Sequence, residues 1–535
     1  MKKLLVLLLL PAFVTHSALA QIKVFKEVSD GVSSQIKTIR QDNSLVGYLV
    51  FTRLEKANVD SFNYRITIMD ENLNNIGKVE FKEIGLTLEN VSFDQDVLCL
   101  GYLKSNFLDQ EYRSKTKYRK AIPNAKNSVL MQFISLDGKI IKANSIPVNI
   151  NLEKHFNQAF GSVYANANLK YPVLVKNISQ RGFACFFGDD SGNNLLVFNA
   201  KGDLLWQKKV ITKANDFYML TSGENIYLLS KTNYNVGTVA APGGYALLDN
   251  EGNYELLGYR YDGASAETHF DLKDDKGNKL KVIKFDNDMV TGKPYLAGCI
   301  IDPKKEGKYA SGRELSKAPY MGIFTINISG NKPADLQKVF TYWSDGSTPG
   351  VSVRGRFAET DSYVMFTDAF RDFKGNTYFT GPEMIRRVRW GSIASSIITA
   401  PLIIPPIWIL GFGGTSKCKT TDAMVVKQDA KGELSVENSI PAEHSSYHKA
   451  IAAIAYYNNQ SFYTVFNSDT KTNYLVVDDG KNILIYNVNT KNVVRTIPHK
   501  DGNIKTYVFP AKEGHLMVSE YNRKENSTRY SIEAL

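Results

Sequence analysis

The sequence predicts an all-β protein folded as a β-propeller of four-stranded blades, with eight blades preferred and seven as the alternative. Three observations favour this fold. Short apolar or alternating runs recur between turns rich in Asp, Asn and Gly. These runs group into similar units of four along the chain, as propeller blades do. The last unit lacks a strand that the N-terminal region supplies, which is how propellers close their ring.

The composition agrees with a large β-rich fold. The chain has 535 residues, of which 43% are hydrophobic and 22% charged, so a disordered or collagen-like protein is excluded. It contains 29 Tyr and 28 Phe, residue types that favour strands. The formal net charge of +11 is spread over scattered lysines and forms no basic stripe, so we expect no nucleic-acid partner.

The turns between runs share one chemistry. An Asp or Asn at the start bonds its own backbone, and a Gly supplies the positive φ that closes the hairpin. The clearest turns are 136–139, 199–203, 249–253, 274–278, 372–376 and 429–433.

The blades can be placed from the runs and the turns. The predicted blades span 35–83, 87–148, 173–210, 215–258, 280–344, 361–439, 449–497 and 504–535. The eighth has three strand candidates, and Ile22–Val28 supplies the fourth, so strands from both termini close the ring. The alternative is a pair of β-sandwich domains divided near 260–280.

The N-terminus has the pattern of a signal peptide. Lys2 and Lys3 precede the apolar run 4–10, and Ala18-Leu19-Ala20 forms a small-residue cleavage site. The sequence therefore predicts a signal peptide at 1–20 and one propeller-like domain at 21–535. We expect an exported protein that is periplasmic, associated with the outer membrane, or secreted.

In an exported protein, four cysteines would be in an oxidising compartment: Cys99, Cys185, Cys299 and Cys418. They can pair in three ways or stay unpaired. Cys99 and Cys185 lie inside apolar runs, which favours their packing as small buried side chains.

Two inserts interrupt the blade pattern. A polar insert at 106–127 is expected to be a long loop between strands. An apolar insert occupies 385–420, and its central part, 392–414, carries no charge over a length that would span a membrane. Three prolines within it argue against a span, since each removes a backbone donor. A single crossing would also separate the two halves of one blade.

The apolar insert is the candidate contact site. Flanking cations and tryptophans are typical of interfacial segments. The candidate partner or membrane contacts are Arg386, Arg387, Arg389, Trp390, Ile403, Ile404, Ile407 and Trp408. The insert packs on the propeller or plugs its channel, touches lipid, or docks a partner protein, and the sequence leaves these alternatives open.

Catalytic and cofactor motifs are missing from the sequence. It contains no HExxH, GxSxG, P-loop or strand-linked GxGxxG motif. We therefore assign no catalytic, cofactor-binding or metal-binding residue and expect no cofactor.

The later part of the chain carries a series of local features: an Asp before an apolar strand, a Gly turn, an Ile-Pro exit, a Ser-Tyr pair and a strand before a variable insert. They lie at 420–434, Ile440-Pro441, Ser446-Tyr447, 462–466 and 375–381. With these features the chain resembles a family of secreted Bacteroidota proteins of unknown function. The chain departs from the family at Ser435-Val436, where a Trp is common. The resemblance implies an exported propeller and carries over no catalytic residue.

These observations favour a non-enzymatic binding or scaffold protein of the bacterial cell envelope or exterior. It would recognise an unknown envelope protein or polymer through its blade loops and apolar insert. One alternative is a propeller enzyme acting on a polymer or glycan, with carboxylates in a central cleft. Another is a membrane-peripheral protein held by residues 392–412.

Overall fold

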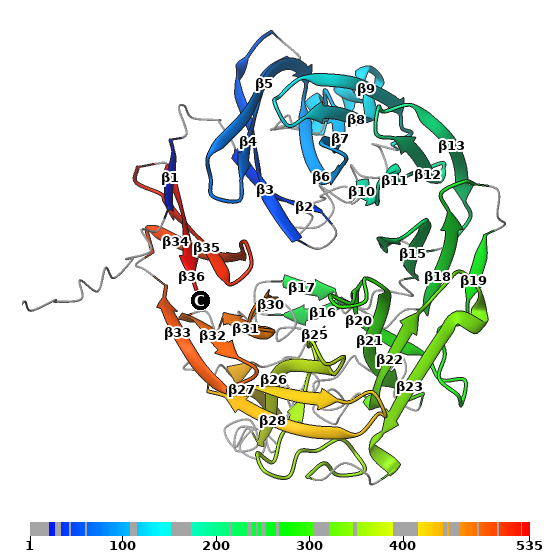
Figure 1. The fold of residues 1–535 in the computed structure, drawn as a ribbon, viewed down its shortest axis with the longest axis vertical. Coiled ribbons are helices and arrows are strands. Elements are labelled where there is room, and N and C mark those ends of the chain that lie inside the picture. The colour runs from blue at the N-terminus through cyan, green and yellow to red at the C-terminus, as the bar shows by residue number, and fades with distance from the viewer. Residues whose placement is uncertain are drawn as a thin grey trace, which may run out of the picture.

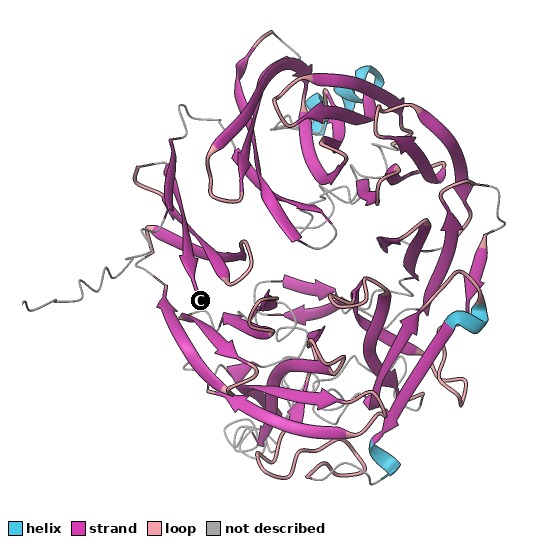
Figure 2. Cartoon of the chain, in the orientation of Figure 1, coloured by secondary structure: helices cyan, strands magenta, loops and turns pink. Residues whose placement is uncertain are grey.

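The protein is an eight-bladed β-propeller. Eight blade sheets stand in a ring around a central axis (Figure 1), and strands dominate the cartoon (Figure 2). The computed structural model describes residues 21–535 except 27–33, 42–43, 59–60, 108–114, 151–172, 213, 215, 233–237, 242–243, 248–252, 264–266, 304–319, 346–349, 389–415, 442–446, 449–460, 479–480, 500–501 and 526. The prediction of eight blades is confirmed, and the seven-bladed and two-sandwich alternatives are wrong.

Each blade runs from an innermost first strand to an outermost fourth strand. Blade 1 is β2 (Ser34–Gln41), β3 (Ser44–Lys56), β4 (Ser61–Asp70) and β5 (Asn75–Ile84); blade 2 is β6 (Leu86–Asp94), β7 (Val97–Ser105), β8 (Asn127–Ser135) and β9 (Ile140–Pro147); blade 3 is β10 (Val173–Ile178), β11 (Gly182–Asp189), β12 (Gly192–Asn199) and β13 (Leu204–Val210); blade 4 is β14 (Asp216–Ser222), β15 (Asn225–Thr232), β18 (Asn253–Arg260) and β19 (Thr268–Phe270).

The second half of the ring repeats this order. Blade 5 is β20 (Leu280–Asn287), β21 (Pro294–Ile301), β22 (Tyr320–Ile328) and β23 (Leu336–Tyr342); blade 6 is β24 (Tyr363–Val364) with β25 (Asp368–Arg371), then β26 (Thr377–Val388), β27 (Ser416–Gln428) and β28 (Leu434–Ile440), with β29 (Tyr447–His448) beside β27; blade 7 is β30 (Ser461–Asn467), β31 (Thr472–Asp478), β32 (Asn482–Asn487) and β33 (Asn492–Pro498); blade 8 is β34 (Ile504–Pro510), β35 (His515–Asn522), β36 (Ser527–Ala534) and β1 (Gln21–Lys26).

The burial of each strand follows its position in the blade. Second strands such as β7 and β21 are buried along nearly their whole length, because neighbouring blades cover both of their faces. The outermost strand β9 instead alternates exposed and half-buried residues, as a strand with one solvated face does. The apolar runs that marked blades in the sequence are therefore mainly the central strands.

The hydrophobic core is divided among the blade interfaces. Eight buried clusters are present in the described part of the chain, and each joins two neighbouring blades. The cluster around Phe133 and Phe198 joins blades 2 and 3, for example, and the cluster around Tyr48 and Tyr530 joins blades 1 and 8. Each blade is thus stabilised by burying apolar area on both sides.

The N-terminal strand closes the ring. Strand β1 pairs antiparallel with β36, from Gln21 opposite Ile532 to Lys26 opposite Ser527, and becomes the outermost strand of blade 8. Figure 1 shows β1 beside β36. The Lys23 Nζ also donates to the Asn75 Oδ1 of blade 1 at 3.0 Å. The predicted closure by strands from both termini is confirmed.

The two faces of the ring differ in their connections. Because strands alternate in direction, the connections from first to second and from third to fourth strand lie on one face, which we call the turn face. Its longest connections between described strands are 261–267 and 329–335. The connections from second to third strand, and from blade to blade, lie on the opposite loop face. The long ones are 106–126, 148–172, 233–252, 302–319, 343–362, 389–415 and 441–460.

Both predicted inserts leave the blades at the loop face. The polar insert carries α1 (Lys115–Ala121) and the 3-10 turn η1 (Ile122–Asn124), so the expectation of a plain loop is corrected by a short helix in its described part. The apolar insert joins β26 to β27, whose pairing continues up to Val388 opposite Ser416. Residues 389–415 lie outside the described residues. No helix in the described part of the chain is long and apolar enough to cross a membrane.

Glycine turns on the turn face bring blades 2 and 3 close to the blade before each of them. Gly138 has φ +90, and a Cβ there would lie 2.4 Å from the Lys78 backbone oxygen of blade 1. At the corresponding turn of blade 3, the Gly202 oxygen accepts from the Asn144 Nδ2 of blade 2 at 2.9 Å. The predicted Gly turns therefore close hairpins and also set how closely two blades approach.

Replacing Gly138 tests this double role. Gly138→Ala adds the strain of a positive φ, about 1–3 kcal/mol, and a backbone clash with Lys78. The control is Gly375→Ala, because Gly375 has φ +83 and nothing within 4 Å of its ideal Cβ. We expect Gly138→Ala to lower the urea midpoint clearly more than Gly375→Ala. Equal losses would mean that the blade contact at Gly138 is unimportant.

Candidate functional site

A cavity of about 820 Å³ lies in the central channel. Every blade contributes to its wall, and one lining residue from each is Thr38, Ser92, Asn177, Thr221, Asn287, Phe370, Phe466 and Pro510. Nearly all lining residues lie at or just beyond the ends of first strands, and they include the turn residues Gly223, Gly292 and Glu513. The cavity is therefore at the turn-face end of the channel, on the side away from the long connections.

Four cations from four blades line this cavity: Arg40, Lys176, Lys284 and Arg371. Carboxylates hold Lys284 and Arg371 in place. The Lys284 Nζ lies 3.3 Å from the Asp368 Oδ1 and 3.8 Å from the Asp286 Oδ2. Burial by itself lowers the pKa of Lys284, but these two carboxylates outweigh burial and raise it.

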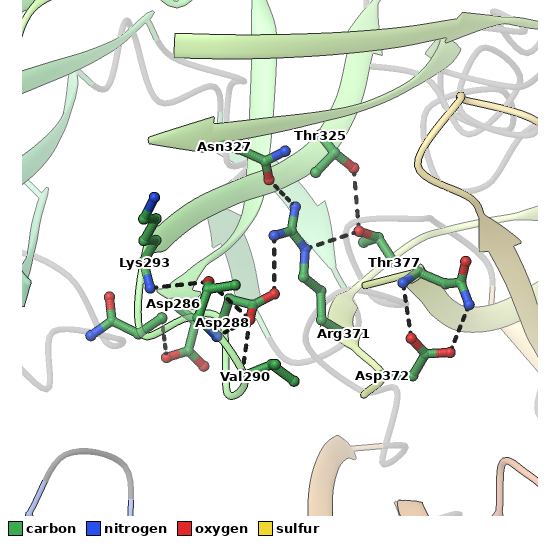
Figure 3. A network of polar contacts seen from close by, with 12 residues as sticks. Asp286, Asp288, Val290, Lys293, Thr325, Asn327, Arg371, Asp372 and Thr377 are labelled. Atoms are coloured by element: carbon green, nitrogen blue, oxygen red, sulfur yellow. Dashed lines mark hydrogen bonds and ion pairs between the residues drawn. The ribbon is translucent and has the colours of Figure 1, made fainter. Parts of the chain in front are cut away.

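Arg371 is the centre of a structural network at the cavity wall (Figure 3). Its Nη1 lies 3.2 Å from the Asp288 Oδ2, its Nη2 donates to the Asn327 Oδ1, and its Nε donates to the Thr377 Oγ1 at 3.4 Å. Its guanidinium carbon also lies 4.2 Å from the centre of the Tyr295 ring. Arg371 therefore ties strands of blades 5 and 6 together, which is a structural role.

Asp288 receives Arg371 and also orders the turn after β20. Its Oδ1 accepts from the backbone N–H groups of Val290 at 3.0 Å and Thr291 at 2.8 Å. Burial favours a higher pKa for Asp288, but the hydrogen bonds from Thr291 and Arg371 lower it below its ordinary value. This carboxylate is consequently charged and fully engaged, and it holds a turn that borders the cavity.

Lys176 is placed differently. Among the residues that the structure describes, its side chain makes no hydrogen bond or ion pair, and the charges acting on it are those of Asp286 and Arg40. Burial lowers the pKa of Lys176, Asp286 partly opposes this, and the like charge of Arg40 lowers it further. Burial also lowers the pKa of Arg40. Asp286, whose side chain is 48% exposed, thus attracts both Lys176 and Arg40.

Of the residues proposed from the sequence, the structure describes the backbone of two, Arg386 and Arg387. Arg386 and Arg387 are on β26, opposite Cys418 and Lys417 of β27, and their side chains lie outside what the structure describes. The other proposed contacts also lie outside the described residues, so all of them stay predictions: Arg389, Trp390, Ile403, Ile404, Ile407 and Trp408.

Cysteine and metal chemistry contribute little to the described site. Cys99, Cys185 and Cys299 are buried free thiols. Burial raises the pKa of Cys99, and the nearby Cys185 thiol raises it further. In the part of the chain that is described, no group of three or more His, Cys, Asp or Glu side chains is arranged to hold a metal ion.

Sequence reasoning missed the cavity residues. A signal was present, because charged residues recur near the ends of first strands in blades 1, 3, 5 and 6, as at Arg40, Lys176, Asp286 and Arg371. Aligning the blades on their turn-face turns would have shown this recurrence.

The fold and cavity define an eight-bladed propeller with a charged central chamber. A family of unknown function (DUF6770) matches residues 1–116, which reach from the N-terminus into the connection after β7. No curated protein matches the chain.

Three solved structures are similar to the chain at low sequence identity. The Dos1 propeller is 8% identical, with a TM-score of 0.42, covering 96% of this chain and 95% of that one. Hsv2 of Kluyveromyces lactis is 8% identical, with a TM-score of 0.33, covering 84% and 98%. A catalytically inactive virginiamycin B lyase of Staphylococcus aureus, solved with quinupristin, is 10% identical, with a TM-score of 0.32, covering 91% and 100%. Likenesses this remote carry no argument about function.

The charge of Lys176 can be tested through stability. The pKa of Lys176 is lowered in the folded protein, whereas in the unfolded chain it is about 10.4. Between these two pKa values the unfolded chain therefore binds more protons than the folded protein. The free energy of unfolding therefore rises with pH from the folded pKa of Lys176 up to its pKa in the unfolded chain. We expect Lys176→Met to stabilise the protein at pH 7, by about 1 kcal/mol, and this gain to shrink at alkaline pH.

The measurement is the urea midpoint at pH 7 and at alkaline pH. Lys374→Met is the matched control, because Lys374 is exposed on the turn face and does not line the cavity. It should change stability little at either pH. A Lys176→Met variant less stable than the wild type at pH 7 would show that the Lys176 charge is well compensated.

Proposed function

We propose that the protein is a non-enzymatic binding protein of the bacterial cell envelope or exterior, and that its central cavity binds a small anionic ligand. The observation that carries the proposal is Lys176, a cation in the cavity wall with no hydrogen bond or ion pair in the described part of the chain. An anion beside Lys176 would offset the burial and the repulsion from Arg40 that disfavour its charge. The volume of about 820 Å³ fits a small-molecule site.

The carboxylates near the cavity favour binding over catalysis. A propeller hydrolase needs a carboxylic acid and a carboxylate free to act on the substrate. Here Asp288 is held by Arg371, and Asp368 and Asp286 converge on Lys284. These ion pairs hold the Arg371 and Lys284 side chains in place at the cavity wall. The Asp286 side chain is 48% exposed and also lines the cavity.

Export and a partner are further parts of the proposal. The signal-peptide pattern of residues 1–20 supports export. The clustering of long connections on the loop face supports a partner on that side, since recognition residues concentrate in long loops. A small ligand and a macromolecular partner would then use opposite faces of one ring.

Calorimetric titration of residues 21–535 tests the anion site. Acetate, benzoate and inorganic phosphate are compared with the neutral amides acetamide and benzamide at low ionic strength. We expect at least one anion to bind, the amides not to bind, and Lys176→Gln to weaken binding at least tenfold. Lys374→Gln should bind as the wild type does.

Two results would contradict the anion site. One is equal binding of an acid and its neutral amide, since charge would then play no part. The other is unchanged anion affinity in Lys176→Gln, because the anion would then sit elsewhere on the protein.

A further inference from the structure

We infer that Lys176 captures its ligand covalently, and that this ligand is a small 2-oxo acid whose carbonyl carbon forms a reversible C=N bond with the Lys176 Nζ. The inference rests on the proposed anion site and names the class of ligand that it takes. Three observations carry it. Lys176 lines the cavity, its amine is not held by any carboxylate in the described part of the chain, and a second lysine of the same wall is held by one.

Lys176 is placed to meet a small molecule. It lies near the end of β10, the innermost strand of blade 3, and is half-buried in the wall of the cavity of about 820 Å³. Val175 and Ile178 of the same strand belong instead to the buried clusters between blades. Lys176 therefore lines the chamber, while its neighbours on the strand form the core.

The surroundings of Lys176 favour a neutral amine. In the part of the chain that the structure describes, its Nζ makes no hydrogen bond or ion pair, and the carboxylate that acts on it, Asp286, lies 3.8 Å from the Lys284 Nζ. Burial and the like charge of Arg40 both lower the pKa of Lys176. A neutral lysine amine has a free electron pair and attacks carbonyl carbons.

The remaining charged residues of the cavity wall have contacts of their own and are not among the groups that act on Lys176. These residues are Lys284 with Asp368, Arg371 with Asp288, and Glu513 with Ser468. Asp286 and Arg40 are therefore the two charges that decide the state of the Lys176 amine.

Lys284 provides the comparison within the same wall. Its Nζ lies 3.3 Å from the Asp368 Oδ1, and the carboxylates of Asp368 and Asp286 raise its pKa. The Lys284 amine is therefore charged at neutral pH and has no free electron pair for attack. The two lysines share one cavity and differ in the state of their amines.

The capture step needs no oxidant or reductant. The Lys176 Nζ attacks the carbonyl carbon, a C–N bond forms, and one nitrogen proton passes to the carbonyl oxygen. That oxygen then leaves as water with the second nitrogen proton, and a C=N bond remains. One water is released for each ligand captured, and addition of water to the C=N bond frees the ligand again.

The charge of Arg40 favours an oxo acid over a neutral aldehyde or ketone. Once protonated, the C=N nitrogen carries a positive charge, which burial and Arg40 disfavour as they disfavour charged Lys176. In a 2-oxo acid, the carboxylate is attached to the carbon that bonds the nitrogen. Its negative charge lies beside the new positive charge and offsets both effects. The ligand is thereby an anion, as the proposed site requires.

Reductive trapping on residues 21–535 tests the inference. The probes are pyruvate, a 2-oxo acid, and acetone, the ketone without a carboxylate. Cyanoborohydride reduces any C=N bond to a stable amine, and mass spectrometry of peptides locates it. At pH 7 we expect pyruvate to modify Lys176 about tenfold faster than Lys284, and acetone to modify Lys176 far more slowly than pyruvate. Lactate has the carboxylate and no ketone, so it should slow the trapping by competition.

The pH dependence of trapping gives a second readout. The exposed Lys374 is the reference, because it lies on the turn face and does not line the cavity. Only neutral amines attack, and an ordinary lysine becomes neutral near pH 10.4, about its unperturbed pKa. The ratio of the Lys176 rate to the Lys374 rate should therefore fall as the pH rises.

A Lys176→Arg variant separates covalent capture from ionic binding, since arginine keeps the positive charge and forms no C=N bond. In calorimetric titrations the wild type should bind pyruvate more tightly than lactate, and Lys176→Arg should bind the two acids equally. Lys374→Arg is the matched control and should keep the wild-type preference. Trapping on the wild-type protein tests the inference even if Lys176→Arg does not fold.

The outcomes distinguish the two proposals. If Lys176 is trapped no faster than Lys284, covalent capture is overturned, and lactate binding that Lys176→Gln weakens would leave the anion site standing. If acetone is trapped at Lys176 as fast as pyruvate, the oxo acid is overturned as the class of ligand. If no acid binds and Lys176 is not trapped, both proposals fail.

Discussion

The pairing of β1 with β36 is the constraint on which the rest of the structure depends. It places the first described strand of the chain on the outer edge of its last blade. Strand β1 completes blade 8 and reaches blade 1 through the Lys23–Asn75 hydrogen bond, and Tyr48, Met517 and Tyr530 are buried between these two blades. Without this eighth interface both blades would expose an apolar face, and β36 would present an unpaired edge. The central chamber exists only inside a closed ring, because all eight blades form its wall.

Stability and recognition are carried by different parts of each blade. The second and third strands supply most of the buried apolar surface at the interfaces. The ends of the first strands instead place charged side chains around the axis, where burial opposes their charge. Lys284 and Arg371 are matched by carboxylates, whereas Lys176 is left with a field that an incoming anion would improve. A buried charge that its surroundings disfavour, within a fold that is otherwise well satisfied, is typical of binding sites.

Much of the fold could be predicted from the sequence, because repeated strands, Asp-Gly turns and complementary termini are local patterns. The cavity could not be predicted, since a side chain points to the axis or away from it according to strand register. The register shifts at two places beside the cavity: Val46 is the extra residue of β3 opposite Ile39 and Arg40, and Ile283 is the extra residue of β20 before Lys284. Each shift reverses the alternation that a sequence pattern assumes. The sequence-based choice of the apolar insert as the contact site falls on residues outside the described structure, and it stays a prediction.

Ligand binding by a chain that lacks residues 21–26 tests most directly whether the closed ring creates the site. Titration with acetate, benzoate and inorganic phosphate, with the molecular mass followed by light scattering, compares this chain with residues 21–535. We expect the shortened chain to lose measurable binding and to self-associate through the edge of β36. A shortened chain that stays monomeric and binds these anions as tightly as residues 21–535 do would contradict a chamber built by ring closure.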